Sequence, residues 1–317
     1  MNQDNLVKIE GCFQEASITD ELCSASITSY RSSIGRFFTI IGDKPLEEVS
    51  NDDINNFIIL MKGGGAGSPR IRSVINAIKW IVVKMQERGV IFKQLNLLTI
   101  KQPKLMKKEV NYLTEAEVNQ FLGCVKGEIK KSETVKNIRF MAFAMLLLQT
   151  GARIGEVLSI NIEDINKQNM EIPIIGKGRK PRSLYLTDAT IYWIDKYLAT
   201  RHDSEKALFA TQDGMSRWKQ TDAGRSFRKF KIMSGIKKKF TIHTLRHTFA
   251  TQYLMKGAGI NVVQSALGHS DPVTTLKFYS GAVEKVKVKE MLNDKKFDFI
   301  PDSALRMDYF LRRYLKM

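Results

Sequence analysis

This 317-residue sequence lacks the features that mark membrane and secreted proteins. No run approaches the roughly 18 apolar residues that a membrane-spanning helix requires. The most hydrophobic segment, FMAFAMLLL at 140–148, is short and is soon followed by Gly151 and Arg153, so it indicates a buried helix. The first residues, MNQDNLVKIE, also lack the basic-then-apolar pattern of a signal peptide.

Cysteines and metal-binding patterns are scarce as well. Cys12, Cys23 and Cys124 are odd in number and lack metal-type spacing, which predicts reduced thiols in a cytoplasmic protein. The GKG at 176–178 lacks the surrounding GxxxxGKS/T of a nucleotide-binding phosphate loop. The sequence shows no cluster of Asp and Glu that could hold two Mg²⁺ ions, which argues against a metal-dependent nuclease or transposase.

Positive charge, by contrast, is in excess: 50 Lys and Arg face 33 Asp and Glu, a net charge of +17. Residues 1–100 hold 11 basic and 11 acidic residues, so residues 101–317, with 39 and 22, carry the whole excess. Within the first part the balance changes from acidic over 1–61 (4 basic, 10 acidic) to basic over 62–100 (7 basic, 1 acidic). A basic surface of this extent favours nucleic acid as the partner over a merely solvated lysine-rich surface.

Apolar residues in the first hundred positions recur at helical spacing. They predict helices over 24–41, 50–61 and 69–88, and a capping box of Ser50 and Asp53 opens the second of these. The third helix carries cations on the side opposite its apolar face, and a basic linker around Pro103 follows it. Cations of this helix and linker are the candidate DNA-contacting residues: Arg70, Arg72, Lys79, Lys84, Lys104, Lys107 and Lys108.

The second half begins with another capping box, TEAE at 114–117. Helices are expected at about 114–125 and 133–149. The segments INIEDI, MEIPII and RSLYLT within 160–187 alternate and are rich in β-branched residues, which predicts strands, with GKGRK at 176–180 as a hairpin turn. From 188 onward the pattern is helical again, apart from loops near 203–216 and 235–241.

Six residues in this second half carry the chemistry that the sequence suggests: Arg153, Lys177, His243, Arg246, His269 and Tyr279. Each has an ordinary alternative. Arg153 could bind a phosphate or pair with Glu156, Lys177 could be a solvated turn lysine, and the histidines and the tyrosine could be packing residues. His243 and Arg246 are one helical turn apart and share a face.

Taken together, these residues suit the cleavage of a phosphodiester. A phenol is a poor nucleophile at pH 7, so it attacks only where cations stabilise the charge that develops. Two guanidiniums and imidazole donors suit the extra negative charge on the phosphate oxygens, and Lys177 can supply the proton that the leaving sugar oxygen needs.

The motifs that contain these residues resemble those of the tyrosine recombinase (phage integrase) family. The resemblance is carried, in order, by TGARIGE, GKGRKPR, HTLRHTFAT and LGHS followed by TTLKFY, over about residues 111–280. It implies that Arg153, Lys177, His243, Arg246 and His269 are the activating residues and that Tyr279 is the nucleophile. One departure is that the ten-residue interval from His269 to Tyr279 is one longer than is common in the family, so the nucleophile would be re-aimed locally.

The resemblance also implies an architecture. The fold would be mainly α with a small β-sheet, arranged as a two-domain DNA clamp. It would comprise a helical, SAM-like core-binding domain (1–95), a basic linker (96–111), a catalytic domain (112–292) and a C-terminal tail helix (293–317). In the last of these, Met307, Phe310, Leu311, Tyr314 and Leu315 fall on one helix face, which needs a surface to dock on. That surface could belong to the same catalytic domain, whereas the resemblance favours docking on a neighbouring protomer.

The implied activity is site-specific recombination through a 3′-phosphotyrosine and a Holliday junction, for integration, excision or resolution, without metal or nucleotide cofactor. The expected partner is double-stranded DNA with inverted-repeat core sites, bound by a homotetramer that is a monomer in free solution. Two alternatives stay open at this stage. A type IB topoisomerase uses a similar set of residues, and a non-enzymatic DNA-binding protein could have kept the fold.

Overall fold

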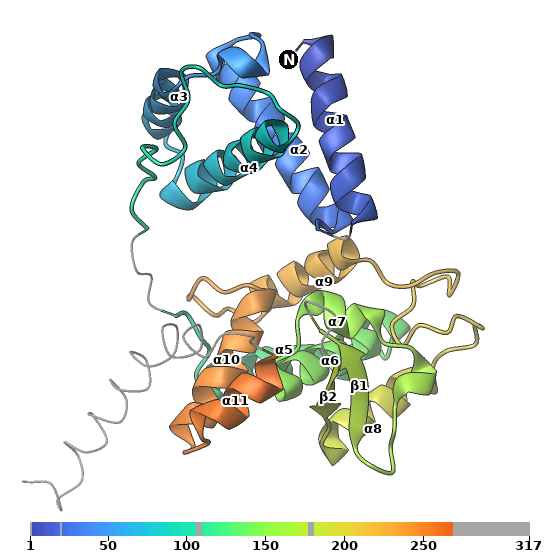
Figure 1. The fold of residues 1–317 in the computed structure, drawn as a ribbon. Coiled ribbons are helices and arrows are strands. Elements are labelled where there is room, and N and C mark those ends of the chain that lie inside the picture. The colour runs from blue at the N-terminus through green and yellow to red at the C-terminus, as the bar shows by residue number, and fades with distance from the viewer. Residues whose placement is uncertain (1, 20, 106–109, 177–180, 269–317) are drawn as a thin grey trace, which may run out of the picture. The chain divides into compact units, whose positions relative to one another are not determined.

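The computed structural model describes residues 2–19, 21–105, 110–176 and 181–268 (Figure 1). The chain divides into two compact units, residues 1–107 and 108–317. In the described residues the fold is mainly helical with one small sheet, which confirms the predicted fold class. Of the helices in those ranges, none is both long and apolar enough to cross a membrane.

The first unit is a cluster of helices around an aliphatic and aromatic core. Trp80 stacks on Phe13 at 5.4 Å between ring centroids and meets Tyr30 edge-on at 5.6 Å, so one indole joins three helices. Residues 96–105, which the sequence assigns to a linker, lie against this unit, where Ile100 is buried in its core. The elements of this unit are α1 (Gln3–Ile18), α2 (Ser24–Ile41), a 3₁₀ turn (Leu46–Glu48), α3 (Asn51–Gly63) and α4 (Ser68–Glu87).

The second unit is built around one apolar helix, α6 (Val135–Thr150). It contains the FMAFAMLLL segment and is buried along most of its circumference, as expected for a helix that is hydrophobic on all sides. Around it the helices α5, α8, α9 and α10 pack, and aromatic rings fill the space between them. The other helices of this unit are α5 (Glu115–Lys131), α7 (Ile154–Ser159), α8 (Asp188–Leu198), α9 (Gln220–Met233), α10 (Ile242–Met255) and α11 (Ile260–Leu267).

The sheet is a hairpin of β1 (Glu171–Ile175) and β2 (Pro181–Tyr185), paired antiparallel. Its register places Ile172 opposite Leu184 and Ile174 opposite Arg182, so these four side chains share the inward face. The first predicted strand, INIEDI, is wrong: residues Ile162–Asp164 form a 3₁₀ turn with a capping box of Asn161 and Asp164. The predicted hairpin turn lies largely at 177–180, outside the described residues.

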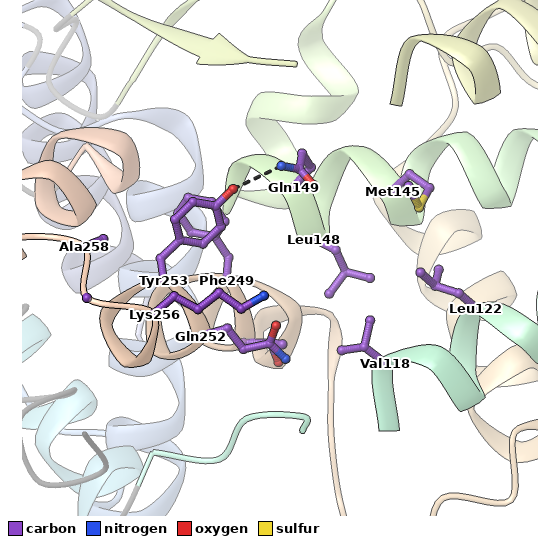
Figure 2. A pocket seen from close by; sticks show the side chains of 12 residues that line it. Val118, Leu122, Met145, Leu148, Gln149, Phe249, Gln252, Tyr253, Lys256 and Ala258 are labelled. Atoms are coloured by element: carbon purple, nitrogen blue, oxygen red, sulfur yellow. Dashed lines mark hydrogen bonds between the residues drawn. The ribbon is translucent and has the colours of Figure 1, made fainter. Parts of the chain in front are cut away.

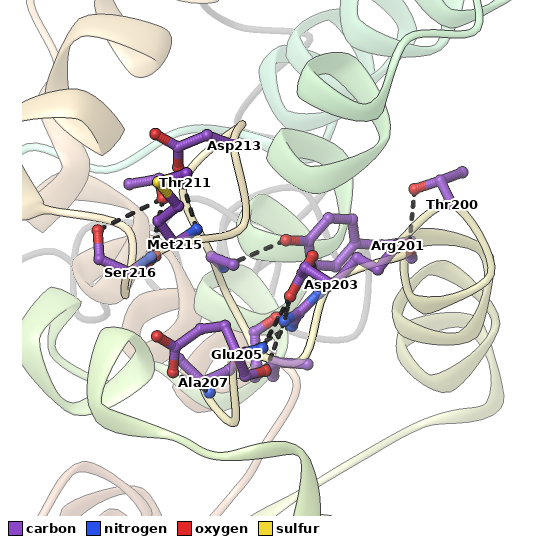
Figure 3. A network of polar contacts seen from close by, with 12 residues as sticks. Thr200, Arg201, Asp203, Glu205, Ala207, Thr211, Asp213, Met215 and Ser216 are labelled. Carbon is purple, nitrogen blue, oxygen red and sulfur yellow. Dashed lines mark hydrogen bonds and ion pairs between the residues drawn. The ribbon is translucent and has the colours of Figure 1, made fainter.

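A polar network holds the long loop between α8 and α9 (Figure 3). The nearly buried Arg201 guanidinium pairs with Asp203 and donates to the backbone oxygens of Glu205 and Ala207, the latter at 2.6 Å. The Ala210 N–H donates to the Tyr197 hydroxyl at 3.2 Å. The Arg201 guanidinium thereby donates hydrogen bonds to loop carbonyls that would otherwise lack a partner near the core.

The end of α6 requires a glycine. Gly151 adopts a left-handed conformation (φ 62°), and a Cβ at this position would lie 2.4 Å from Cδ1 of Phe249 and 2.9 Å from Cδ2 of Leu267. A side chain would therefore suffer both backbone strain and overlap. Gly155, four residues later in α7, offers a contrast, because a Cβ there would meet no described atom within 4 Å.

We therefore predict that Gly151→Ala lowers the free energy of unfolding of the second unit by about 2 kcal/mol. Gly155→Ala is the matched control and should be neutral or slightly stabilising, because alanine favours a helix over glycine. Urea unfolding in a Trp80→Phe background, which leaves Trp193 and Trp218 as reporters of this unit, measures both. Equal effects of the two substitutions would contradict the prediction.

Candidate active site

Arg153 occupies the turn between α6 and α7, where it is the N-cap residue of α7. Its backbone N–H donates to Oε2 of Glu156 at 2.6 Å, and its Nη1 pairs with Oε1 of the same carboxylate at 2.8 Å. The ion pair that the sequence offers as an alternative for Arg153 is thus present. The Arg153 side chain nevertheless keeps 32% of its surface exposed, so the ion pair with Glu156 does not enclose it.

Glu156 is held by a second guanidinium. Nη2 of Arg182, on β2, lies 2.8 Å from Oε2 of Glu156, and the two side chains are only 10% and 8% exposed. Burial alone would raise the pKa of Glu156, but the Arg153 N–H and the two guanidiniums outweigh it and lower that pKa overall. Glu156 is therefore a carboxylate at neutral pH.

Arg182 and Arg246 both donate to the C-terminal end of α11. Nη1 of Arg182 donates to the Ala266 carbonyl, and Nη2 of Arg246 donates to the Leu267 carbonyl at 2.7 Å. Nη1 of Arg246 reaches back to the Gly151 carbonyl at 2.7 Å. The bonds form a closed circuit from the turn before Arg153, through Glu156 and Arg182, to the end of α11 and back through Arg246. We call this the arginine circuit.

The structure thus joins two of the candidate catalytic residues, Arg153 and Arg246, although 93 positions separate them in the sequence. Arg246 is only 7% exposed, whereas His243, one turn earlier on α10, is exposed. His247, which directly follows Arg246, is partly buried. Burial, together with the charges of Arg246 and His243, lowers the pKa of His247, so its imidazole is neutral at pH 7.

The other three candidates, Lys177, His269 and Tyr279, lie outside the described residues. Lys177 belongs to the segment between β1 and β2, and His269 directly follows Gly268, which ends α11 in a left-handed conformation (φ 63°). Another tyrosine of this region, Tyr253 on α10, has a packing role. Its ring lies 4.4 Å from that of Phe249, and its hydroxyl accepts a hydrogen bond from Gln149 at 3.1 Å.

Several of the candidate DNA-contacting cations are engaged within the first unit. Arg72 donates to the Pro103 carbonyl at 3.3 Å, Lys79 to the Leu97 carbonyl at 3.1 Å, and Lys84 pairs with Glu21 and Glu87. Arg70 and Lys104 are exposed. Lys107 and Lys108 lie outside the described residues.

Two features of the second unit escaped the sequence analysis. The first is Arg182: strand alternation places it on the inward face with Leu184, and an inward-pointing arginine is a signal that a buried partner exists. The second is a basic face on α9, opposite the buried Ala223, Phe227 and Phe230. Helical spacing alone predicts that face, whose exposed cations are Arg225, Arg228 and Lys229.

A groove of about 700 Å³ lies on the second unit between α5, α6 and α10 (Figure 2). Val118 and Leu122 of α5 face Met145 and Leu148 of α6 across its apolar floor. The lining also includes polar side chains, among them Gln149, Gln252 and Lys256. The groove is apolar enough to bind a nonpolar side-chain face and carries polar groups that could orient it.

Because Glu156 neutralises a nearly buried arginine, we predict that Glu156→Gln lowers the free energy of unfolding by about 3 kcal/mol at pH 7. The folded-state pKa of Glu156 lies below its unfolded value. The stabilisation in the wild type is therefore present above about pH 4.3 and is lost as the pH falls through the folded pKa. The difference between wild type and variant should accordingly shrink in acid.

Urea unfolding at several pH values measures this difference. The exposed Glu163, on the next turn of the chain, provides the control, and Glu163→Gln should change stability by less than about 0.5 kcal/mol. A pH-independent difference for Glu156→Gln would show that the carboxylate charge is not what stabilises the circuit.

Known proteins resemble this chain in sequence and in fold. The sequence pattern of the phage integrase family matches residues 111–285. The tyrosine recombinase XerD of Oceanobacillus iheyensis is 30% identical over 294 residues, which cover 89% of this chain and 96% of that protein.

Two solved structures share the fold. One is the XerH site-specific recombinase bound to palindromic difH substrate in a post-cleavage complex (TM-score 0.68, 21% identity, 90% of this chain and 88% of that chain). The other is a lambda integrase dimer bound to a COC′ core site (TM-score 0.68, 15% identity, 84% and 92%). The match of the family pattern over more than half of the chain, with the XerD relative, shows that this chain belongs to the phage integrase family of tyrosine recombinases.

Proposed function

We propose that this protein is a site-specific DNA recombinase that cuts and rejoins strands through a 3′-phosphotyrosine intermediate and a Holliday junction. The observation that carries the proposal is the arginine circuit, which ties the turn of Arg153 to Arg246 through hydrogen bonds to Gly151 and to the end of α11. Membership of the tyrosine recombinase family supports the same chemistry. Integration, excision and resolution all use this reaction.

In the proposed mechanism the phenol of Tyr279 gives up its proton to solvent water as its oxygen attacks the scissile phosphorus. The bond from phosphorus to the 5′ oxygen breaks, and Lys177 gives that oxygen a proton. Arg153, Arg246, His243 and His269 stabilise the negative charge that grows on the phosphate oxygens. The 5′ hydroxyl of another strand then attacks the phosphotyrosine, restoring the phosphodiester and releasing the phenol. The free energy of the broken phosphodiester bond is retained in the phosphotyrosine bond, so the reaction consumes no nucleotide.

The Glu156 carboxylate has a defined role in this scheme. With Arg153 and Arg182 around it, the trio carries a net charge of +1. The carboxylate orients Arg153 through two hydrogen bonds but does not cancel the positive charge that faces the phosphate. A guanidinium held in this way loses little freedom when it binds, which favours the transition state.

We propose double-stranded DNA with inverted-repeat core sites as the partner. The related XerH structure contains a palindromic substrate, and the lambda integrase dimer is bound to a core site. We assign phosphate contacts to the cations of α4 and the segment after it, with the exposed Arg70 and Lys104 as the most accessible of the described ones. We place the reaction in the cytoplasm, which suits the unpaired thiols of Cys12, Cys23 and Cys124.

Removing the phenol oxygen tests the proposal directly. We predict that Tyr279→Phe binds core-site DNA within about twofold of wild type but forms no covalent adduct, because only the nucleophile is lost. A nicked suicide substrate in EDTA, followed by denaturing gel electrophoresis, traps the adduct of the wild type. Tyr253→Phe is the control and should retain it. An adduct in Tyr279→Phe would assign the nucleophile elsewhere, and a strict requirement for Mg²⁺ would contradict the mechanism.

We further propose that the active assembly is a homotetramer on synapsed DNA, in which the C-terminal tail of one protomer docks in the α5–α6–α10 groove of its neighbour. The sequence of the tail places Met307, Phe310 and Tyr314 on one helix face. A helix of about 13 residues is marginal alone in water, so that face needs a partner surface. The apolar floor of the groove matches it, and Gln149, Gln252 and Lys256 could meet polar groups of the tail.

Deleting residues 301–317 should therefore leave the binding of one half-site nearly intact but abolish cooperative binding of a full site and strand exchange. Val118→Glu, which puts a charge into the groove, should reproduce the loss. Met215→Glu, at an exposed residue outside the groove, should not. Gel shifts on half and full sites, beside a strand-exchange assay, compare the three. Full recombination by the truncated chain would refute tail docking as a requirement for assembly.

A further inference from the structure

None of the proposed chemical steps uses Arg182, although it is the more enclosed of the two arginines that pair with Glu156. Its side chain is 10% exposed, and its two terminal nitrogens bind different elements: Glu156 of α7 and the Ala266 carbonyl of α11. Its Nε is buried without a hydrogen-bond partner among the described residues. A buried donor without a partner costs free energy, so the favourable polar contacts of this side chain are those of its two terminal nitrogens.

The surroundings of Arg182 would accept a nonpolar residue. Its strand neighbours on the inward face are Leu184 and Ile174, both buried. A well-packed nonpolar side chain is often at least as stable as a buried ion pair. The stem of Arg182 also lies so close to Gly268 that a Cβ there would be 2.8 Å from Cδ and from Nε. The packing around this side chain therefore gives no reason of its own to keep an arginine at this position.

We propose that Arg182 is a positioning residue for strand cleavage, acting through Glu156 on Arg153. The proposal rests on the recombinase function proposed above. Arg182 compensates the Glu156 carboxylate, so the positive charge of Arg153 remains available to the scissile phosphate instead of being cancelled by its own N-cap partner. Its second contact holds the end of α11, directly before His269, in register with the turn of Arg153.

The net charge of the three groups distinguishes an electrostatic role of Arg182 from a purely structural one. Arg153, Glu156 and Arg182 sum to +1 in the wild type. Arg182→Met leaves a sum of zero, so Arg153 should be drawn to Glu156 and serve the phosphate poorly. The double variant Arg182→Met with Glu156→Gln returns the sum to +1. A purely structural role predicts that the second substitution adds damage, whereas the electrostatic role predicts rescue.

The experiment measures single-turnover cleavage of the nicked suicide substrate by the full-length chain, below the unfolding transition of every variant. We expect Arg182→Met to cleave about 100-fold more slowly than wild type, with half-site affinity changed by less than about threefold. The double variant should recover at least about tenfold of that loss. Arg182→Lys keeps the charge sum at +1 and should likewise recover part of the loss, but not all of it, because one ammonium cannot reproduce the two-pronged contact.

Arg217 provides the matched control. It is a partly buried arginine of the same unit that donates to the carbonyls of Leu158 and Ile160, and it has no contact with Glu156 among the described residues. Arg217→Met should leave the cleavage rate of the folded protein within about threefold of wild type. A wild-type rate in Arg182→Met, or a double variant slower than Arg182→Met, would overturn the proposal. Absence of any adduct with the wild type would instead overturn the recombinase function, and this inference with it.

Discussion

The capping of one short helix orders the candidate site. The last four carbonyls of an α-helix lack partners within the helix. In α11 the Gly268 N–H serves the carbonyls of Gln264 and Ser265, Arg182 serves Ala266, and Arg246 serves Leu267. The partial negative charge at this helix end favours the two cations. Because those arginines come from β2 and α10, satisfying α11 also fixes these elements beside the turn of Arg153.

This arrangement depends on close packing around two glycines. Gly151 and Gly268 both adopt left-handed conformations, and a Cβ on either would overlap a side chain of the site: Phe249 and Leu267 in the first case, Arg182 in the second. The glycines let the chain turn sharply and bring a guanidinium against the backbone. These close approaches require a rigid core beside them. The aromatic core around α6 provides it and includes the stacked rings of Phe140 and Phe230, whose centroids are 4.6 Å apart.

Local sequence patterns predicted most of the helices and little of the circuit. The helix at 24–41 and the capping boxes at Ser50 and Thr114 are present as expected, because spacing and caps are local signals. The helix α1 was missed, since its buried face consists largely of weak signals such as Cys12 and Ala16, and Gly11 interrupts it. INIEDI looked like a strand because its isoleucines alternate, but the Asn161–Asp164 capping box turns it into a 3₁₀ segment.

The site shows the same division between local and tertiary information. The motifs identified Arg153 and Arg246 as residue types suited to phosphate, and the spacing of three put His243 on the same helix as Arg246. Their connection could not be predicted, because it runs through the carbonyls of Gly151 and Leu267. Every residue has a backbone oxygen, so the sequence does not show which one accepts a side-chain hydrogen bond. Arg182 was overlooked for a related reason: its importance comes from two acceptors far away in the chain, not from a motif of its own.

The electrostatics of the circuit explain why the protein tolerates buried arginines. Among the described residues, Arg153 and Arg182 pair with one carboxylate, Glu156, which leaves these three groups with a net charge of +1. Desolvating these groups is unfavourable, and the lowered pKa of Arg182, caused first by burial, reflects that cost. In the reaction that we propose, the anionic phosphodiester gains negative charge as it is attacked, so it would become the missing counterion. The positive charge left uncompensated in the protein is therefore stabilised most in the transition state, which is where such a site must act.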